Sequence, residues 1–320
     1  MAAGTNSGAT AEFFSTLNTE VEVQFQELFS AGSGIAGSHT EYTDVSSGHT
    51  GTTLEINVVG AVPVLREWVG ARHSDGVRGY KQTNVRKDYE KTLRVFETDY
   101  DSQGGDALRR RVTDFLPTVG YDVTKIAHDF WLTNPDCYDG VSLYSASHVH
   151  GAADATQSNL TSSDLSLSTA YAAINAMRQL TDNKGRNLGI NPNKIYVGGL
   201  LLPRALEIFQ AENRVIGIDF NGNESGNRLA AAASNNVYRG MLDVVYDPLL
   251  TGYTAYIMDT TKNAKPILLR EIAGYPDLTS LTAKTDANVF FNREYVWGVQ
   301  WASILACGAW QTSHLINGTA

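Results

Sequence analysis

Hydrophobic side chains recur every three or four residues in the first part of the chain, between Ala11 and Gly32. This spacing places them on one face of an α-helix. The residues on that face are Phe14, Leu17, Val21, Phe25 and Leu28. We therefore predict a helix that begins near Ala11 and ends before Gly32. The ten small and polar residues before it are expected to be disordered.

A longer hydrophobic stripe runs from Asp106 to Trp131. It consists of Leu108, Val112, Phe115, Leu116, Val119, Val123, Ile126, Ala127 and Phe130. Pro117 lies inside the stripe, and a proline inside a helix removes one hydrogen bond and bends the axis. Because the stripe keeps its phase through Pro117, we predict one long bent helix, roughly 40 Å in length, that spans the subunit.

The segment between these two stripes alternates between hydrophobic and polar residues, as a half-buried strand does. Residues 54–59 show the alternation, and strand-like pieces recur between 83 and 96. The stretch from 66 to 94 is locally basic, with eight Lys or Arg against four acidic residues. We predict a long projecting hairpin. An acidic protein could place such a basic arm on an acidic neighbour, although an ordinary surface hairpin would carry the same charges.

The remaining hydrophobic segments are short and predict a mixture of helices and strands. Helices are expected at about 167–180 and 203–212, and strands at 194–197, 242–246, 254–259, 267–272, 289–291 and 295–305. Ser166 is suited to cap the first of these helices. Polar segments at 38–53, 142–166 and 219–236 are expected to be loops. Helices and strands do not alternate in βαβ units, so the predicted fold class is α+β.

The composition is that of a folded protein and matters mainly for what it argues against. The chain has 320 residues, of which 42% are hydrophobic, and a formal net charge of −9. Binding nucleic acid by bulk electrostatics requires clustered Lys and Arg. The longest basic run is Arg109-Arg110-Arg111, which is typical of a solvated or interface face of a helix. We find no signal peptide, membrane span or disulfide framework, and expect a protein made and used in a cytoplasm.

Each candidate chemical site in the sequence lacks an essential part. Residues 32–37 match the glycine pattern of dinucleotide-binding loops, but a helix precedes them and a polar stretch follows, which reverses the required context. His148 and His150 could join Cys137 in a partial zinc site, but zinc needs more ligands and Cys307 is remote in sequence. We expect a loop with two solvated histidines there. With no G-x-S-x-G motif either, we predict no catalytic residue, cofactor or metal, and no enzyme.

Two segments resemble a known family. The first is Leu65-Arg66-Glu67-Trp68-Val69-Gly70-Ala71-Arg72. The second spans 130–148, is centred on Cys137-Tyr138-Asp139-Gly140 and ends Leu143-Tyr144-Ser145-Ala146-Ser147-His148. In order and spacing, with a long helix between them, they resemble the Mu-like phage major head subunit family. Residues 295–298 and 308–311 are also similar to the carboxy-terminal ends of capsid proteins in this wider group.

The resemblance implies the tailed-phage major capsid protein fold. The implied parts are an N-terminal arm at 1–50, an extended E-loop at 51–100, a peripheral domain at 101–185 with a spine helix at 106–131, an axial domain at 186–285, and a return to the peripheral domain at 286–320. The implied function is self-assembly into hexamers and pentamers that form the icosahedral head around double-stranded DNA, which is held without sequence-specific binding. The implied location is the virion capsid, after assembly in the host-cell cytoplasm and away from membranes.

The resemblance also implies partners and contacts. We expect a portal and decoration proteins, and a separate scaffold protein or a prior cleavage, because the predicted first helix leaves no room for an amino-terminal scaffold extension. Assembly contacts are expected at Arg66, Glu67, Trp68, Arg72, Arg78, Lys81, Arg86, Lys87, Arg109, Arg110 and Arg111.

Three other interpretations stay open at this point. A non-viral, encapsulin-like compartment shell of the same fold would carry a cargo-loading groove. A soluble hydrolase would show a deep pocket that holds a perturbed titratable group. A tail or portal component would form rings or tubes.

Overall fold

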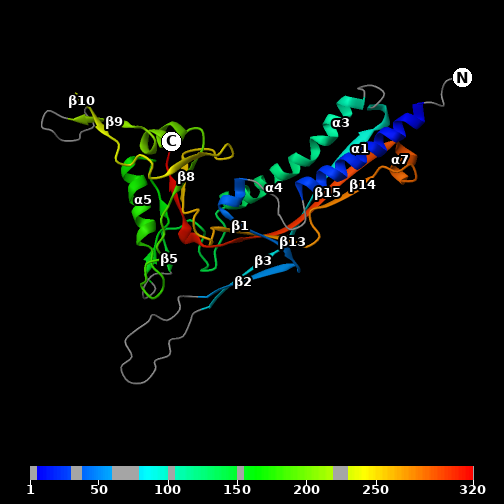
Figure 1. Cartoon of the computed structure of the whole chain (residues 1–320). Helices are drawn as coiled ribbons and strands as arrows, with labels where there is room; N and C mark the ends of the chain where they lie inside the picture. Colours follow the sequence, from blue (N-terminus) through cyan, green and yellow to red (C-terminus); the bar gives the residue numbers. More distant parts are fainter. Residues whose placement is uncertain are drawn as a thin grey trace. The chain divides into compact units, whose positions relative to one another are not determined.

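The computed structural model describes residues 6–29, 38–59, 79–99, 105–149, 155–218 and 230–319. The chain forms two compact units, each built from segments far apart in the sequence. Unit 1 consists of Met1–Glu55, Thr83–Thr133 and Leu268–Ala306, and unit 2 of Ile56–Gln82, Asn134–Ile267 and Cys307–Ala320. Helices and sheets occur in both, so the predicted α+β class is confirmed (Figure 1).

A five-stranded sheet forms the base of unit 1. Its strands are β1 (Thr43–His49), β4 (Lys87–Phe96), β13 (Ile267–Ile272), β14 (Asp277–Leu281) and β15 (Glu294–Cys307). The order is β1-β13-β15-β14, and β4 also pairs with β15. The antiparallel pairing of β4 with β15 runs from Phe96 opposite Glu294 to Lys87 opposite Ser303. β15 is therefore bonded to three other strands of the sheet.

The helix α1 (Asn6–Leu28) packs its predicted hydrophobic face into the core of unit 1. The buried residues are Phe14, Leu17, Val21 and Phe25, as predicted, whereas Leu28 is 45% exposed. Phe14 stacks on Tyr295 with ring centroids 3.6 Å apart. The helix begins at Asn6 instead of Ala11, so residues 6–10, for which disorder was expected, are helical.

The stripe predicted as one bent helix forms two successive helices, so the predicted continuity is wrong. α3 (Gly105–Thr113) and α4 (Phe115–Leu132) are separated by Asp114. Pro117 explains the break, because it has no N–H to donate to the carbonyl of Thr113 and is tolerated in the first turn of a helix. The hydrophobic stripe itself continues across the break, since Val112 and Phe115 are both buried. Figure 1 shows both helices alongside α1.

Unit 2 is built around a second five-stranded sheet. Its order is β11 (Asp243–Tyr246), β8 (Lys194–Val197), β12 (Thr254–Met258), β16 (Ser313–Asn317) and β7 (Leu160–Thr161). The helices α5 (Leu167–Gln179) and α6 (Leu202–Phe209) contribute to its core. The predicted cap of α5 is confirmed, because Ser166 accepts a hydrogen bond from the Thr169 N–H in a capping box. The core of unit 2 thus includes α5, although this helix precedes residue 186, where the resemblance placed the start of the axial domain.

The described residues also form three two-stranded sheets. β2 (Thr53–Val59) pairs with β3 (Gly79–Val85) as a two-stranded sheet, and the residues between them lie outside the described part. β9 (Asn213–Ile218) pairs with β10 (Ala230–Asn235), and β5 (His148–Val149) pairs with β6 (Thr156–Gln157).

Some predicted loops and strands differ from the structure. The predicted loops at 38–53, 142–166 and 219–236 contain β1, β5 to β7 and β10. β1 and β7 pair with the remote strands β13 and β16, which the local sequence does not reveal. Residues 289–291, predicted as a strand, lie in the helix α7 (Ala287–Asn292). Arg293 ends this helix with a left-handed backbone at φ 52°. The hydrophobic run was too short to distinguish helix from strand by its period.

Gly198 provides a test of the packing in unit 2. Its carbonyl accepts hydrogen bonds from the N–H groups of Leu201 and Leu202 at the start of α6. A Cβ at this position would overlap the backbone carbonyl of Leu250. We predict that Gly198→Ala lowers the free energy of unfolding by about 2 kcal/mol, because the backbone must shift. Urea unfolding followed by circular dichroism measures this.

Gly199→Ala is the matched control, because the atom nearest to its added Cβ is a side-chain carbon of Tyr246 at 4.0 Å. It should change the free energy of unfolding by less than about 0.5 kcal/mol. Equal effects of the two substitutions would contradict the packing described here.

Candidate assembly interface

The expected assembly contacts divide into those that the structure describes and those that it does not. Five of them lie outside the described residues: Arg66, Glu67, Trp68, Arg72 and Arg78. The other six are described: Lys81, Arg86, Lys87, Arg109, Arg110 and Arg111.

Two of the described arginines are engaged within the subunit. Arg86 donates to the carboxylate of Asp88 at 2.7 Å and lies over the ring of Tyr275, with its guanidinium carbon 5.2 Å from the centroid. Arg109 on α3 forms an ion pair with Glu20 on α1 at 3.0 Å. These two side chains therefore stabilise the packing of unit 1.

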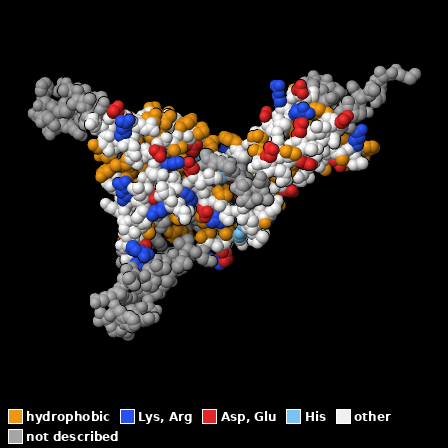
Figure 2. All heavy atoms as spheres, viewed as in Figure 1, with side chains coloured by type: hydrophobic (Ala, Val, Ile, Leu, Met, Phe, Trp, Pro, Cys, Tyr) orange, Lys and Arg blue, Asp and Glu red, His pale blue; other side chains and the backbone are white. Residues whose placement is uncertain are grey.

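The other four basic residues are exposed. Lys81 lies on β3, Lys87 at the start of β4, and Arg110 and Arg111 on α3. On the face shown in Figure 2, Lys and Arg side chains are interspersed with Asp and Glu and do not form one large basic patch. This distribution suits local ion pairs with a neighbouring protein better than a track for nucleic acid.

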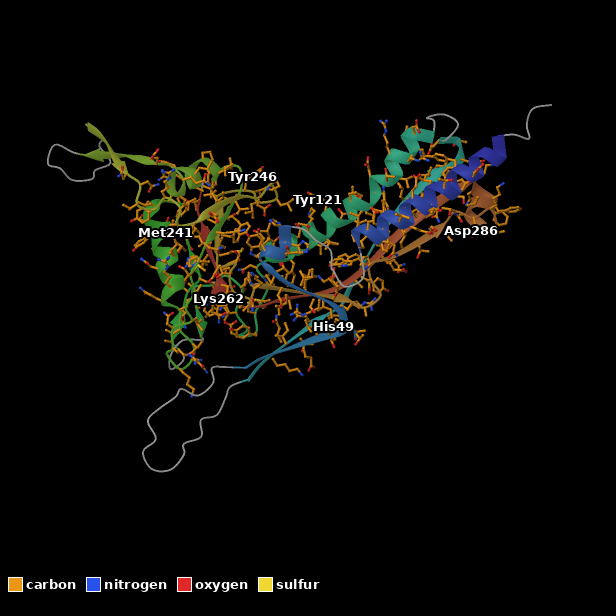
Figure 3. The ribbon with its side chains drawn as sticks, in the orientation of Figure 1. His49, Tyr121, Met241, Tyr246, Lys262 and Asp286 are labelled. Atoms are coloured by element: carbon orange, nitrogen blue, oxygen red, sulfur yellow. A yellow bond between two sulfur atoms is a disulfide. The ribbon has the colours of Figure 1, made fainter. Side chains whose placement is uncertain are left out.

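Sequence reasoning missed an exposed aromatic pair on α7. Phe290 and Phe291 are 72% and 77% exposed, and their rings meet edge to face with centroids 5.0 Å apart. The turn before the helix is held by Asp286, whose carboxylate accepts a hydrogen bond from the Ala283 N–H at 2.8 Å (Figure 3). Adjacent exposed aromatic rings are typical of a protein-binding surface. The run of hydrophobic residues at 289–291 was the signal, but it was interpreted as a buried strand.

An acidic groove of about 640 Å³ lies between α1 and β14 in unit 1. The carboxylates of Glu22, Glu27 and Asp277 line it, together with Val23, which is 51% exposed. The groove is open, and its lining combines these acids with the hydrophobic residues Val23, Phe25 and Leu278. This chemistry favours a basic protein segment as its ligand.

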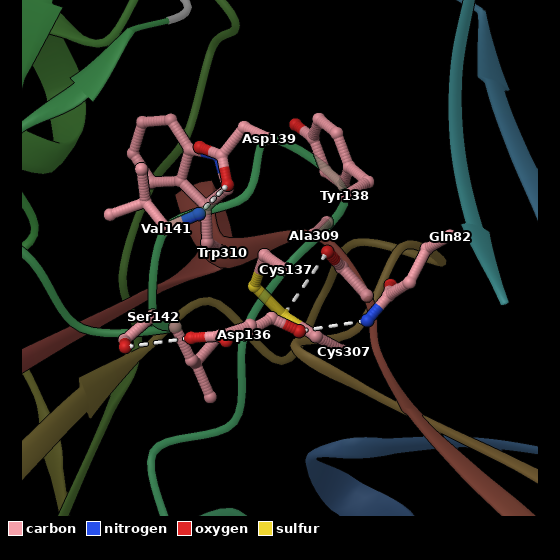
Figure 4. The surroundings of a disulfide bond; sticks show 12 residues. Gln82, Asp136, Cys137, Tyr138, Asp139, Val141, Ser142, Cys307, Ala309 and Trp310 are labelled. Carbon is pink, nitrogen blue, oxygen red and sulfur yellow. Dashed lines mark hydrogen bonds between the residues drawn. A yellow bond between two sulfur atoms is a disulfide. The ribbon is translucent and has the colours of Figure 1, made fainter. Parts of the chain in front are cut away.

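Unit 2 contains a buried cluster around the Cys137 turn (Figure 4). Cys137 and Cys307 form a disulfide with their Cα atoms 5.0 Å apart, although they are 170 residues apart in sequence. This bond was not predicted from the sequence, in which Cys307 is remote from Cys137. Their pairing depends on tertiary structure, which spacing alone does not reveal. We call Cys137, Asp139, His148, Cys307 and Trp310 the buried cluster.

His148 is fully buried, which corrects the expectation of a solvated histidine. Its Nδ1 lies 2.6 Å from the carboxylate of Asp139, and its ring stacks on Trp310 with centroids 3.9 Å apart. The neighbouring Tyr138 accepts a hydrogen bond from the side-chain amide of Gln311 at 2.8 Å. The turn at 137–140 and the segment at 307–311 are thus held together by several independent contacts. His150 lies outside the described residues.

The buried cluster is structural in character. Cys137 is bonded to Cys307 and His148 to Asp139, so neither is available to the partial zinc site considered above. Over the described ranges, no three His, Cys, Asp or Glu side chains are grouped so that they could hold a metal ion. Among the same residues, every helix is too short or too polar to cross a membrane.

Comparison with known proteins identifies the family. The model of the family described as "Mu-like prophage major head subunit gpT" matches residues 16–171 and 241–319, which is well over half of the chain. The chain belongs to the Mu-like major head subunit family. A comparison with curated proteins found no match. Members of this family are structural proteins of the phage head, so this major capsid protein is not an enzyme.

Solved structures show the fold of this major head subunit. The structure described as "Mycobacterium phage Patience" matches with a TM-score of 0.54 and 10% identity, over 97% of this chain and 88% of that one. "Asymmetric unit of bacteriophage PhiM1 mature capsid" matches with a TM-score of 0.52 and 10% identity, over 90% and 89%. "Capsid structure of the Cyanophage P-SCSP1u" matches with a TM-score of 0.51 and 9% identity, over 92% and 94%. The chain therefore has the tailed-phage capsid fold.

In this major head subunit, the buried cluster is formed largely by two of the segments that carry the resemblance. Residues 137–140 provide Cys137 and Asp139, and residues 308–311 provide Trp310. The resemblance therefore marks residues whose described role is to hold unit 2 together.

The Asp139–His148 contact should contribute strongly to stability. Asp139 is almost fully buried, so its removal leaves His148 with a desolvated ring nitrogen that has lost its partner. We predict that Asp139→Ala lowers the free energy of unfolding by about 3 kcal/mol. Ser142→Ala, which removes a hydrogen bond to Asp136 near the surface, is the control and should cost less than about 1 kcal/mol. A difference of zero between the two variants in urea unfolding would contradict this account.

His314 on β16 should make the stability of unit 2 depend on pH. Burial lowers the pKa of His314 from 6.5 to about 4, and its Nε2 shares a hydrogen bond with the Thr161 hydroxyl at 2.8 Å. Because the folded-state pKa is the lower one, acid favours the unfolded chain. The contribution is complete above about pH 6.5 and is lost as the pH falls toward 4, with a total on the order of 3 kcal/mol.

Urea unfolding at a series of pH values measures this dependence. His314→Gln should flatten the curve between pH 6.5 and 4, whereas His49→Gln, at a partly exposed position, should leave its slope unchanged. Curves of identical slope for the wild type and His314→Gln would contradict the prediction.

Proposed function

We propose that this major capsid protein assembles into hexamers and pentamers that form an icosahedral head around double-stranded DNA. The family match over residues 16–171 and 241–319 carries the proposal. The open groove between α1 and β14 and the exposed aromatic pair of α7 also support it. A shell subunit needs extended surfaces that other copies can bury.

The proposed domain division assigns unit 1 to the peripheral domain and unit 2, apart from its segment Ile56–Gln82, to the axial domain. The sequence-based boundaries were 1–50 for the N-terminal arm, 51–100 for the E-loop, 101–185 and 286–320 for the peripheral domain, and 186–285 for the axial domain. The shared core of α5 and the β8 sheet supports an earlier start of the axial domain, near Asn134. The pairing of β4 with β15 supports an E-loop confined to β2, β3 and the residues between them.

The proposed contacts join basic and acidic surfaces of different copies. Lys81, Lys87, Arg110 and Arg111 are exposed, and the groove between α1 and β14 presents Glu22, Glu27 and Asp277. Each such pair is weak alone, but a closed shell repeats it many times.

The proposed partners are a scaffold protein, a portal and decoration proteins, with assembly in the cytoplasm of the host cell. The net charge of −9 supports a shell that does not bind its DNA tightly, so that the DNA can slide during packaging. A strongly basic inner surface of the assembled head would contradict this part of the proposal.

Charge reversal tests the proposed contacts. Arg110→Glu combined with Arg111→Glu should reduce the yield of assembled particles at least tenfold in sedimentation, without changing the urea midpoint of the subunit. The loss follows from repulsion between the new carboxylates and an acidic neighbour. Lys184→Glu, at an exposed position in unit 2 outside the predicted set, is the control and should assemble normally.

A compensating reversal makes the test specific. Adding Glu22→Lys and Glu27→Lys to the arginine variant should restore part of the particle yield if the groove is the acceptor. Normal assembly of the arginine variant would overturn the proposed role of these residues. Failure of the wild-type protein to assemble with its scaffold would overturn the proposed function.

A further inference from the structure

The disulfide joins two residues of unit 2 that are close in sequence to points where the chain passes from one unit to the other. Cys137 follows the passage at Thr133–Asn134 by a few residues, and Cys307 is the first residue of the last segment of unit 2. The chain has two cysteines, and both take part in this bond. The bond therefore joins two residues that are 170 positions apart in sequence. Each of them lies at or near the start of a segment of unit 2.

At two other points where the chain changes unit, the unit 2 residues contact the segments that carry the disulfide. Pro266 and Lys265, just before the passage at Ile267, accept hydrogen bonds from the N–H groups of Gly308 and Ala309 at 2.7 and 2.8 Å. Gln82, at another passage, donates to the backbone carbonyl of Asp136 at 2.7 Å (Figure 4). Four of the five passages thus meet, on the unit 2 side, around the disulfide.

The surrounding contacts hold the two cysteines in position without the covalent bond. The Cys137 N–H donates to the Val141 carbonyl at 2.8 Å, and its own carbonyl accepts from the Gly140 N–H at 2.9 Å. The stack of His148 on Trp310 joins the two sides. A Cα separation of 5.0 Å is one at which a disulfide can form without movement of the backbone.

We propose that the Cys137–Cys307 bond is a latch that is set by oxidation after the subunit has folded and assembled. The proposal rests on the proposed function, since it places assembly in the reducing interior of a host cell, where thiols stay reduced. Once the particle meets an oxidising medium, the bond ties residues 134–140 of unit 2 to its last segment, which begins at Cys307.

The oxidant is a small-molecule disulfide such as oxidised glutathione. The thiolate of one cysteine attacks the glutathione disulfide, forms a mixed disulfide and releases one glutathione thiolate. The thiolate of the other cysteine then attacks the protein sulfur of the mixed disulfide and releases the second glutathione. Two protein thiols lose two protons and two electrons in total, and one glutathione disulfide is reduced to two thiols.

Burial sets the kinetics of the latch. Cys137 is 4% exposed and Cys307 is fully buried, so exchange requires a local opening of the 137–140 turn. The bond should therefore form slowly in the assembled particle. Once formed, it should resist small reductants until the unit unfolds.

Thiol counting in the assembled particle tests the proposal. Particles taken from cells lysed in N-ethylmaleimide and then denatured with more of the reagent should carry two maleimides per subunit by mass spectrometry. After incubation with oxidised glutathione the count should fall to zero, and a non-reducing gel should still show monomers. Two maleimides per subunit after prolonged oxidation would overturn the latch, as would zero in freshly lysed cells.

Thermal unfolding tests the consequence. Oxidised particles should unfold at a midpoint about 10 °C above reduced ones, because the crosslink restricts the unfolded chain. Cys137→Ser and Cys307→Ser should each behave as the reduced wild type and should not respond to oxidised glutathione. Equal midpoints of the oxidised and reduced wild type would overturn the proposal.

Hydrogen exchange separates this proposal from the proposed function. Oxidation should slow exchange at least tenfold at 134–140, 264–267 and 307–311, and leave α1 unchanged. Serine variants that assemble into normal particles leave the proposed function standing whatever happens to the latch. Failure of the wild-type protein to assemble in either redox state would instead contradict the proposed function.

Discussion

The pairing of β15 with its neighbours is the interaction on which most of unit 1 depends. This strand of fourteen residues is bonded to β4, β13 and β14, and it contributes Trp297 and Trp301 to two hydrophobic clusters. Its partner β4 lies about two hundred residues earlier in the chain, so the sheet forms only when these distant segments meet. The helices α1 and α3 then cover the hydrophobic side chains that the sheet presents. Trp297 joins these two layers, because its ring is buried and its N–H donates a hydrogen bond to Asn18 on α1.

The sequence predicted correctly those elements that depend on residues close together in the chain. The period of α1, the capping residue of α5 and the strands β8, β12 and β13 follow from residues close together in sequence, and all are confirmed. The break at Asp114 was missed because a hydrophobic stripe reports which face is buried and says little about backbone bonds. The helix α7 was missed because a run of three hydrophobic residues has no measurable period. Its exposed phenylalanines break the rule that such residues are buried, as expected where a surface is made for a partner.

The buried cluster shows the limit of sequence reasoning most clearly. Cys137 and Cys307 gave no sign of their pairing, and His148 was interpreted as solvated because its sequence neighbours are small and polar. Both acquire their roles from contacts between segments more than 150 residues apart. The family resemblance pointed to these segments before any physical reason was apparent. The structure supplies the reason, because the same segments form a hydrogen-bonded, disulfide-linked centre in unit 2.

The central claim is that this chain builds a closed shell from many copies of itself. The family match carries this claim, and the exposed aromatic pair on α7 is the kind of surface that a partner protein buries. Negative-stain electron microscopy of the purified protein, alone and with the products of neighbouring genes, tests the claim most directly. The account predicts closed shells, or rings of five and six subunits. A discrete monomer or dimer, even with the scaffold protein present, would contradict it.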